Sequence, residues 1–416
     1  MRKTVMHHTR PGQGGFSLVE LLVTLTLTLG VILGVARILD SARTLYTAQM
    51  HVAEMQQSAR GAMADITRHL RMLGRGGLPA ASAGRSWPDG IALGVANNVP
   101  AGTRILAGVT SAPAVAAHTD ILTVRGVFDS PILQLDATDP TSFVQRADDP
   151  RAGDLWLEST SPAGLPQDLE PLIDSVRESQ GRPHAPPIRE ALLLVGPADP
   201  STYAVVQLDP LESNVSHPER IRLRFLLEDP SRDPDEHPAN HYATLNPGGA
   251  FPRELWESRV GFVGVLEEHR FYVRQDPNAG SEERAGDSVP RLSRARVYPA
   301  TEIPHRHDEK LLALDIAERV VDLQVALGFD GDRDRTSQGD GWLFDGAADD
   351  PAAFLSGLHA VRVTALVRTR RRDRAHISRP IGVIEDRDYA ADPLNDRTAR
   401  LFRRTLVQAV VDLRNL

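Results

Sequence analysis

Acidic side chains alternate with other residues in one short stretch of the chain. Asp330, Asp332 and Asp334 stand at every second position, and Asp340 follows a few residues later. Oxygen ligands at alternate positions are the arrangement that calcium-binding loops use, because Ca²⁺ takes six to eight oxygen atoms. The spacing predicts a calcium ion held by these four carboxylates.

The same stretch departs from a complete EF-hand loop. Arg335 stands where the turn glycine belongs, and Gly341 stands where the bidentate glutamate belongs. Asp345, Asp349 or Asp350 would have to supply that last ligand from the following loop. A solvated acidic hairpin, between one strand that ends at Phe329 and another that begins near Trp342, fits the residues as well.

Two further groups carry chemically useful side chains. His305, Arg306, His307 and Asp308 include metal-ligand types, but two histidines at i and i+2 with no further ligand in view favour a surface turn after Pro304. An arginine run follows an apolar strand and has the chemistry to grip an acidic partner or phosphate groups, although a solvated loop is the simpler interpretation. The run comprises Arg368, Arg370, Arg371, Arg372 and Arg374.

Catalytic signatures are missing from the sequence. It has no Gly-x-Ser-x-Gly elbow, no His-Glu-x-x-His helix and no phosphate-binding Gly-x-x-x-x-Gly-Lys loop. The 416 residues include no cysteine, which excludes thiol catalysis and disulfides, and the net charge of −8 argues against nucleic acid as a partner. With 41% hydrophobic residues the chain is able to bury a core. We therefore expect a protein that is not an enzyme.

The element that must position everything else is an apolar run near the N-terminus. Between Phe16 and Ala36 the only ionisable side chain is Glu20. A helix of about 20 apolar residues crosses the roughly 30 Å hydrocarbon core of a bilayer. The residues before the run carry positive charge and no acid, so the positive-inside rule predicts a cytoplasmic N-terminus and an exported remainder.

The order of residues around this run is informative. A secretory signal peptide has its small-residue cleavage site after the apolar run, whereas Gly14 and Gly15 precede it here. The contiguous stretch from Gly15 through Phe16 and Glu20 to Val23 resembles the prepilin signal of type IV pilins and type II secretion pseudopilins. The resemblance implies that prepilin peptidase cleaves after Gly15 and methylates the amine of Phe16.

Glu20 also has a role by this resemblance. In the family the matching glutamate pairs with the N-terminal amine of a neighbouring subunit during filament assembly. A carboxylate in an apolar helix is costly unless it is paired, so such a partner is physically reasonable. The alternative is a glutamate that lies at the level of the lipid headgroups as a helix-end residue.

The helical pattern continues beyond the apolar run. Steps of three, four and seven residues link the apolar positions Leu45, Val52, Met55, Ala59, Ala62, Ile66 and Leu73. One helix over 16–73 is predicted, with a membrane or filament-core half (16–39) and an amphipathic half (40–73) whose apolar side packs on a sheet. Glycines from Gly74 onward and Pro79 end it. The leader is then 1–15, and the exported globular domain is 74–416.

The rest of the chain predicts a mostly antiparallel sheet, so the fold class is α+β and pilin-like. A helix is expected over 311–320, and 130–189 and 228–253 are expected to be long loops. The expected strands are 91–95, 121–128, 191–195, 203–208, 221–227, a hairpin of 261–266 with 270–274, 321–329, 360–369 and 405–413.

Looser motifs narrow the family. The stretches 65–74, 119–126 and 402–415 resemble PilW-type minor pilins, which are relatives of the J-type minor pseudopilins. The resemblance implies a minor type IV pilin that acts in assembly initiation or at the pilus tip. Its partners would be prepilin peptidase, other minor and major pilins and the inner-membrane assembly platform, and its domain would be periplasmic and then on the pilus. Related proteins carry acidic calcium loops. A type II secretion minor pseudopilin and a pilin-anchored adhesin or ligand-binding protein are the alternatives.

Overall fold

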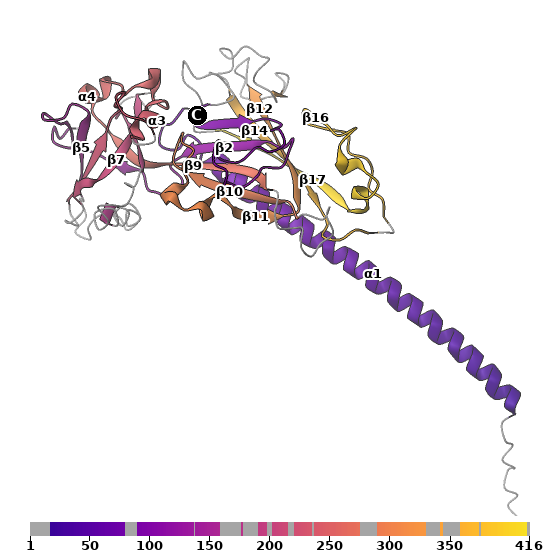
Figure 1. Cartoon of the computed structure of the whole chain (residues 1–416). Coiled ribbons are helices and arrows are strands. Elements are labelled where there is room, and N and C mark those ends of the chain that lie inside the picture. The colour runs from indigo at the N-terminus through magenta and orange to yellow at the C-terminus, as the bar shows by residue number, and fades with distance from the viewer. Residues whose placement is uncertain are drawn as a thin grey trace, which may run out of the picture. The chain divides into compact units, whose positions relative to one another are not determined.

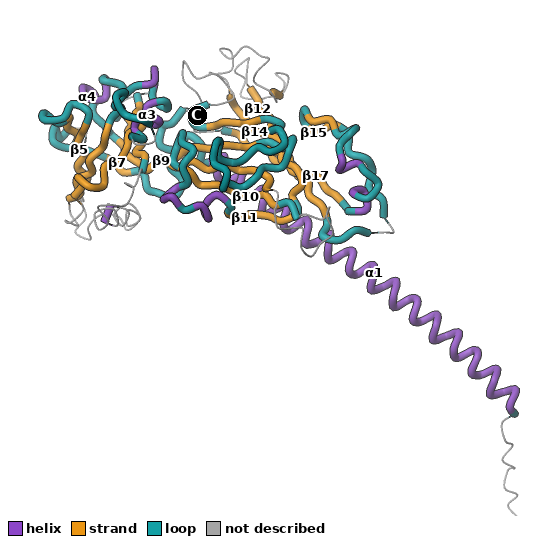
Figure 2. Tube along the Cα trace, in the orientation of Figure 1, coloured by secondary structure: helices purple, strands orange, loops and turns teal. Residues whose placement is uncertain are grey.

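The chain forms one long helix followed by antiparallel strands, so the expected α+β fold is confirmed (Figure 1). The computed structural model describes residues 17–79, 90–136, 138–158, 176–177, 190–197, 202–214, 220–234, 237–274, 289–329, 342–343, 358–373 and 376–413. Figure 2 distinguishes the helices, strands and loops of this part of the chain.

The elements have the following bounds. The helices are α1 (Leu18–Arg71), α3 (Ala239–Ala243) and α4 (Glu254–Ser258), with 3-10 turns at Pro247–Gly249, His305–His307, Glu309–Leu312, Pro393–Asn395 and Ala399–Leu401. The strands are β1 (Leu93–Ala96), β2 (Ile121–Gly126), β3 (Leu133–Gln134), β4 (Phe143–Gln145), β5 (Ala152–Glu158), β6 (Ala191–Val195), β7 (Tyr203–Asn214), β8 (Arg220–Leu226), β9 (Phe262–Arg274), β10 (Arg291–Val297), β11 (Leu314–Glu318), β12 (Val320–Phe329), β13 (Trp342–Leu343), β14 (Leu358–Arg368), β15 (Val383–Ile384), β16 (Arg387–Asp388) and β17 (Arg404–Asp412).

Helix α1 ends where the glycines predict. Gly74 and Gly76 have φ of 73° and 94°, a conformation that residues with a Cβ rarely adopt. A Cβ on Gly76 would also lie 3.1 Å from the Leu193 side chain, so the chain turns back here against the sheet. The helix passes through two compact units, one ending at Glu54 and one beginning at Met55.

The predicted apolar side of the helix is buried over its second half. Met55, Ala59, Ala62, Ile66 and Leu73 are all buried, as expected. The prediction was wrong at the first position, because the Leu45 side chain is 60% exposed. Heptad-like spacing shows that one side of a helix is apolar, but it does not show where along the helix a covering surface begins.

Strand β9 organises the larger sheet, which has eleven strands in the described residues. Its first half pairs with β3 and β6, and its second half pairs with β2 and β10. The other strands extend the sheet in the order β1-β2-β9-β6-β7-β8-β5-β4, with β11 beside β10.

Several predicted elements need correction. The expected hairpin of 261–266 with 270–274 is wrong, because Phe262–Arg274 is one continuous strand. The expected helix over 311–320 is also wrong, since a 3-10 turn there leads into β11, whose ladder bonds go to β10. The expected loop 130–189 contains β3, β4 and β5, and the expected loop 228–253 contains α3.

A smaller sheet of four described strands runs in the order β13-β12-β14-β17. Asp120, just before β2, connects it to the larger sheet: the Asp120 amide donates to the Leu323 carbonyl at 2.9 Å, and the Asp120 carboxylate accepts from the Val325 amide at 2.7 Å. Burial raises the pKa of Asp120 to about 8. The two sheets are therefore joined through a carboxyl group held out of water.

Candidate functional site

The N-terminus of α1 is closed by a reciprocal pair of hydrogen bonds. The Glu20 carboxylate accepts from the Ser17 amide at 3.2 Å, and the Ser17 hydroxyl oxygen accepts from the Glu20 amide at 3.3 Å. This capping box satisfies two of the amides that a helix N-terminus leaves unpaired. Glu20 itself is exposed, so its carboxylate lies at the helix surface beside the first turn.

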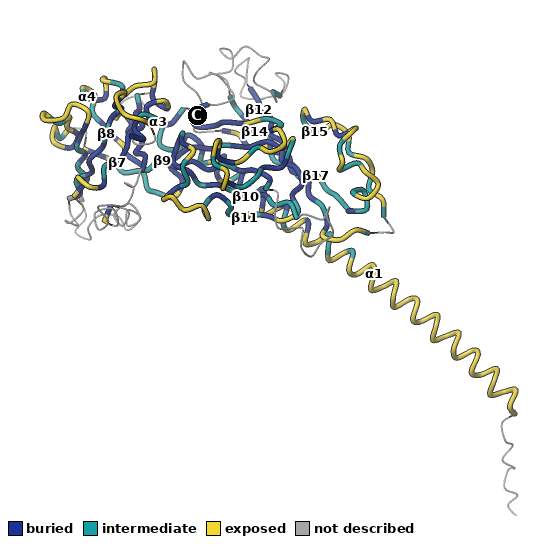
Figure 3. Tube along the Cα trace, viewed as in Figure 1, coloured by how far each residue is buried: buried dark blue, intermediate teal, exposed yellow. Residues whose placement is uncertain are grey.

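The residues in the first part of α1 are exposed (Figure 3), and most of them are apolar. Leu18, Leu27 and Ile38 are 77%, 67% and 69% exposed, and the segment is long and apolar enough to cross a membrane. Thr24 and Thr28 donate their hydroxyls to carbonyls one turn earlier, at 2.6 and 2.7 Å, so these polar groups are satisfied within the helix. Such a surface is suited to lipid tails or to neighbouring helices.

Several predicted site residues lie outside the described residues. These are Gly15 and Phe16 at the predicted cleavage point, and Asp330, Asp332, Asp334 and Asp340 in the predicted calcium loop. Cleavage, methylation and calcium binding therefore stay predictions. Among the predicted site residues, Glu20 is the one that the structure places.

The histidine turn differs from a plain surface turn. His305–His307 forms a 3-10 turn after Pro304, but His305 is buried and its Nε2 lies 3.1 Å from a carboxylate oxygen of Glu190. Burial alone would raise the pKa of Glu190, but the hydrogen bond from His305 opposes it, and the pKa of Glu190 is lowered. His305 is thus occupied in an internal pair.

The arginine run lies partly on an aromatic ring. The guanidinium groups of Arg368 and Arg372 lie 4.3 and 5.5 Å from the centre of the Phe402 ring, and Arg403 pairs with Asp373 at 2.8 Å. A cavity of about 280 Å³ beside Arg368 is lined mostly by arginine and other polar residues. Arg370 and Arg371 are exposed, as a solvated loop requires.

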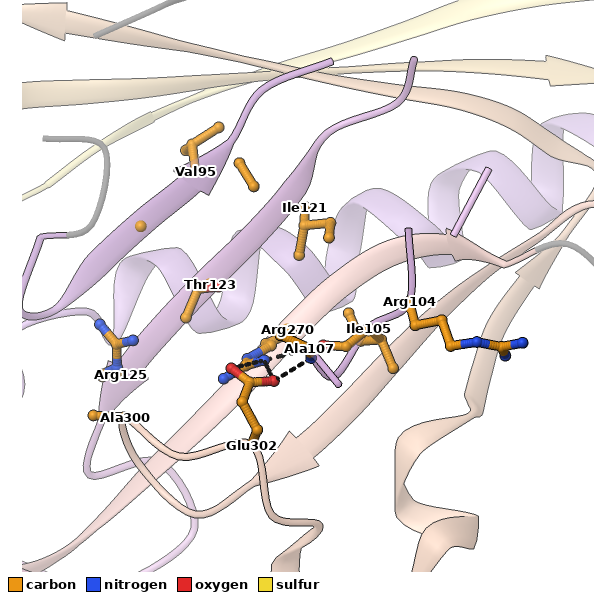
Figure 4. Close-up of a pocket in the computed structure, with 12 residues that line it drawn as sticks. Val95, Arg104, Ile105, Ala107, Ile121, Thr123, Arg125, Arg270, Ala300 and Glu302 are labelled. Atoms are coloured by element: carbon orange, nitrogen blue, oxygen red, sulfur yellow. Dashed lines mark hydrogen bonds and ion pairs between the residues drawn. The ribbon is translucent and has the colours of Figure 1, made fainter. Parts of the chain in front are cut away.

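A groove of about 360 Å³ opens over β1, β2 and β9 (Figure 4). Its polar lining comes mainly from Arg104, Arg125, Arg270 and Glu302. Figure 4 shows the Glu302 carboxylate between the Arg270 guanidinium and the Ala107 backbone, while the Arg104 side chain extends away from them.

A buried ion network forms the floor of this groove. Glu268 is fully buried and accepts from the Nε atoms of Arg125 and Arg270, and also from the Ala300 amide at 2.8 Å. Burial alone would raise the pKa of Glu268, but the two guanidinium groups outweigh it and lower this pKa to about 2. Arg270 also pairs with Glu302 at 3.0 Å.

The groove residues are those that sequence reasoning missed. The expected hairpin places Glu267, Glu268 and His269 in the turn between its two strands, yet these residues lie in the middle of β9. Two features of the sequence could have indicated the pairing of Glu268 with Arg125. The charged run has apolar residues on both sides, as one continuous strand would, and Arg125 lies at the centre of the expected strand 121–128. The lining offers guanidinium and carboxylate groups, so it is suited to binding an ionic or polar ligand.

Comparison with solved structures finds a likeness to a type IV-like pilin from Thermus thermophilus. The sequence identity is 11% and the TM-score is 0.21, over 60% of this chain and 97% of that chain. No protein-family model matches the chain, and no curated protein does. A likeness this distant leaves the function to be argued from the residues of the chain itself.

Proposed function

We propose that this chain is a membrane-inserted precursor that matures into a non-catalytic subunit of a type IV pilin filament. The observation that carries the proposal is the helix α1 itself. Its first part exposes apolar side chains around the helix behind a Ser17–Glu20 capping box, and one side of its last part, from Met55, is buried in an antiparallel sheet domain. A single helix that anchors at one end and supports a domain at the other is what a filament subunit needs.

The charge at Glu20 supports assembly as the role of the first turn. No other ionisable side chain occurs between Phe16 and Ala36, so in an apolar surrounding no side chain of this segment would supply a cation to the carboxylate. The Ser17 amide offers one hydrogen bond but no charge. The N-terminal amine of a neighbouring subunit would supply that charge.

The finer role we propose is that of a minor pilin acting in assembly initiation or at the pilus tip. A domain as large as 74–416 would be hard to repeat along a tightly packed shaft. The partners are then prepilin peptidase, other minor and major pilins and the inner-membrane platform. A type II secretion minor pseudopilin shares the same maturation, and the neighbouring genes distinguish the two.

Processing tests this proposal directly. The mature chain is expected to begin at Phe16 with a methylated amine, and Gly15→Ala should leave the precursor uncut, because a side chain obstructs the approach of the peptidase to the backbone. Mass spectrometry of the N-terminal peptide from the membrane fraction measures both. A mature start near residue 40 would instead indicate a cleaved secretory signal and would refute the pilin proposal.

Assembly is tested separately. Glu20→Ala removes a charge from the apolar segment, so the variant should still insert in the membrane but should not join the filament, where the incoming amine would lack its partner. Fractionation measures insertion, and immunoblotting of sheared filaments measures incorporation. Normal incorporation of Glu20→Ala would exclude Glu20 as the assembly partner.

We also propose a calcium ion at Asp330, Asp332, Asp334 and Asp340. Crowded carboxylates repel one another, so a bound ion should raise the melting temperature by mass action. Titration of the detergent-solubilised chain with calcium measures this shift, which Asp332→Ala should remove. An unchanged melting temperature at millimolar calcium would favour the solvated hairpin.

A further inference from the structure

Three potential metal ligands meet on one face of strand β9. Glu267 and His269 are two residues apart and therefore point to the same face, and Asp129 reaches them from the segment that follows β2. One ligand atom of each residue lies within 4.8 Å of the others. This is the opposite face from Glu268 and Arg270, so the cluster is separate from the groove over β1, β2 and β9.

His269 is an unexplained polar group in the interior. Its residue is 1% exposed, and neither Nδ1 nor Nε2 has a hydrogen-bond partner among the described residues. The rings of His69 and Phe128 pack around it, with centroids 4.9 and 5.2 Å away. Buried polar atoms are usually paired, because an unpaired one has lost its water without compensation.

The state of the imidazole suits a ligand. Neither ring nitrogen of His269 is engaged by a group among the described residues, so the imidazole has a nitrogen free to bind a cation. His69 is not available as a metal ligand in the same way, because its own nitrogens lie 2.8 Å from the Asp65 carbonyl and 2.9 Å from Arg294.

The carboxylates are fixed and reachable. Glu267 is buried and accepts from the amides of Phe128 and Asp129, at 3.1 and 2.7 Å, which hold its carboxylate in place. Asp129 is exposed and gives access from solvent. Arg296 bonds to Glu267 and lies 3.7 Å from Asp129, so a cationic group already stands between the two acids.

We propose that Asp129, Glu267 and His269 bind a divalent transition-metal ion, with Zn²⁺ the best match, and that the metal displaces the Arg296 guanidinium from the two carboxylates. One imidazole nitrogen and two carboxylate oxygens are a zinc donor set, whereas Ca²⁺ and Mg²⁺ prefer oxygen alone. Ligands about 2.0–2.2 Å from a tetrahedral zinc lie within roughly 3.6 Å of one another, so the three atoms, now within 4.8 Å, would draw closer on binding the ion, and the exposed Asp129 side chain is free to move toward it. Water takes the fourth position from the solvent side.

Zinc binding by the full chain in detergent tests the proposal, by competition with a chromophoric chelator after all metal has been removed. His7 and His8 are replaced by alanine throughout, so that a histidine pair near the N-terminus does not contribute. We expect one zinc per chain, with at least tenfold weaker binding in Asp129→Asn and His269→Ala. His118→Ala, which removes an exposed histidine outside the cluster, is the control and should bind as the parent does.

Arg296→Gln should change the zinc affinity in the opposite direction. It removes the competing cation and keeps a polar side chain of similar length, so it should bind zinc at least tenfold more tightly than the parent. A merely structural cluster would not gain affinity. Because Asp129 is exposed, Asp129→Asn keeps the test decisive even if His269→Ala fails to fold. Parental zinc affinity in Asp129→Asn, or weaker zinc binding in Arg296→Gln, would each overturn the proposal.

Discussion

The ion network under the groove predicts a specific loss of stability. The Glu268 carboxylate pairs with both Arg125 and Arg270, and the pKa of Glu268 falls from 4.5 to about 2. At ~1.4 kcal/mol per pKa unit this corresponds to about 3 kcal/mol in favour of the folded state at neutral pH. Removing one partner of a buried ion pair lowers the unfolding free energy of a protein by about 3–5 kcal/mol. Glu268→Gln should therefore lower the unfolding free energy by about 3 kcal/mol.

Denaturant unfolding of the parent and of Glu268→Gln measures this difference, with Glu302→Gln as the matched control. Glu302 also pairs with Arg270 but its side chain is 44% exposed, so its loss should cost no more than about 1 kcal/mol. Because the pKa of Glu268 is depressed on folding, its contribution is present above pH 4.5 and is lost as the pH falls toward 2. Equal stabilities at pH 7, or a difference that persists undiminished near the folded pKa of about 2, would refute the electrostatic reasoning.

The remaining predictions concern packing and a second buried carboxyl. Ile66→Asp places a charge at a buried helix position and should destabilise the domain by more than about 4 kcal/mol, whereas Arg60→Asp at an exposed position should be tolerated. Thermal melts measure the difference, and coinciding melting temperatures would indicate that the helix does not pack on the domain. In Gly153→Ala the new Cβ would lie 2.1 Å from the Phe225 ring, so denaturant unfolding should show a loss of about 1–3 kcal/mol. The pKa of Asp120 is raised from 3.8 to about 8 on folding, so its contribution to stability is present below pH 3.8 and is lost as the pH rises through 8. Between these two values the unfolding free energy should fall by ~1.4 kcal/mol per pH unit, and Asp120→Asn should flatten this fall. An unchanged slope would contradict the assignment.

Local patterns were enough to predict the helix and many strands. The apolar steps from Met55 to Leu73 and the glycines after them predicted a buried helix side and its end, because both depend on residues close in sequence. The strand over 191–195 has the predicted bounds, since a short unbroken apolar run that starts after Glu190 and stops at Gly196 and Pro197 is typical of a buried strand.

Long-range pairing explains what the sequence did not reveal. Glu268 and Arg125 are 143 residues apart, and only their meeting makes a charged run compatible with the middle of β9. Similarly, the apolar residues of 311–320 fit a helix by spacing, but they form β11 because the arginine-bearing strand β10 offers a ladder. The sequence marks these charges but does not identify their partners.

The buried acids of the domain and Glu20 differ in how they are matched. Glu190 meets His305, Glu267 meets Arg296 and Glu268 meets Arg125, so each of these carboxylates finds a basic group within the chain. Among the described residues of the apolar segment, the Glu20 carboxylate accepts a hydrogen bond from the Ser17 amide and meets no cation. A carboxylate that must enter an apolar surrounding needs a cation, and no side chain between Phe16 and Ala36 offers one. We propose that an amine at the N-terminus of an adjacent helix meets that requirement, so that Glu20 would act in assembly and not in the stability of the domain.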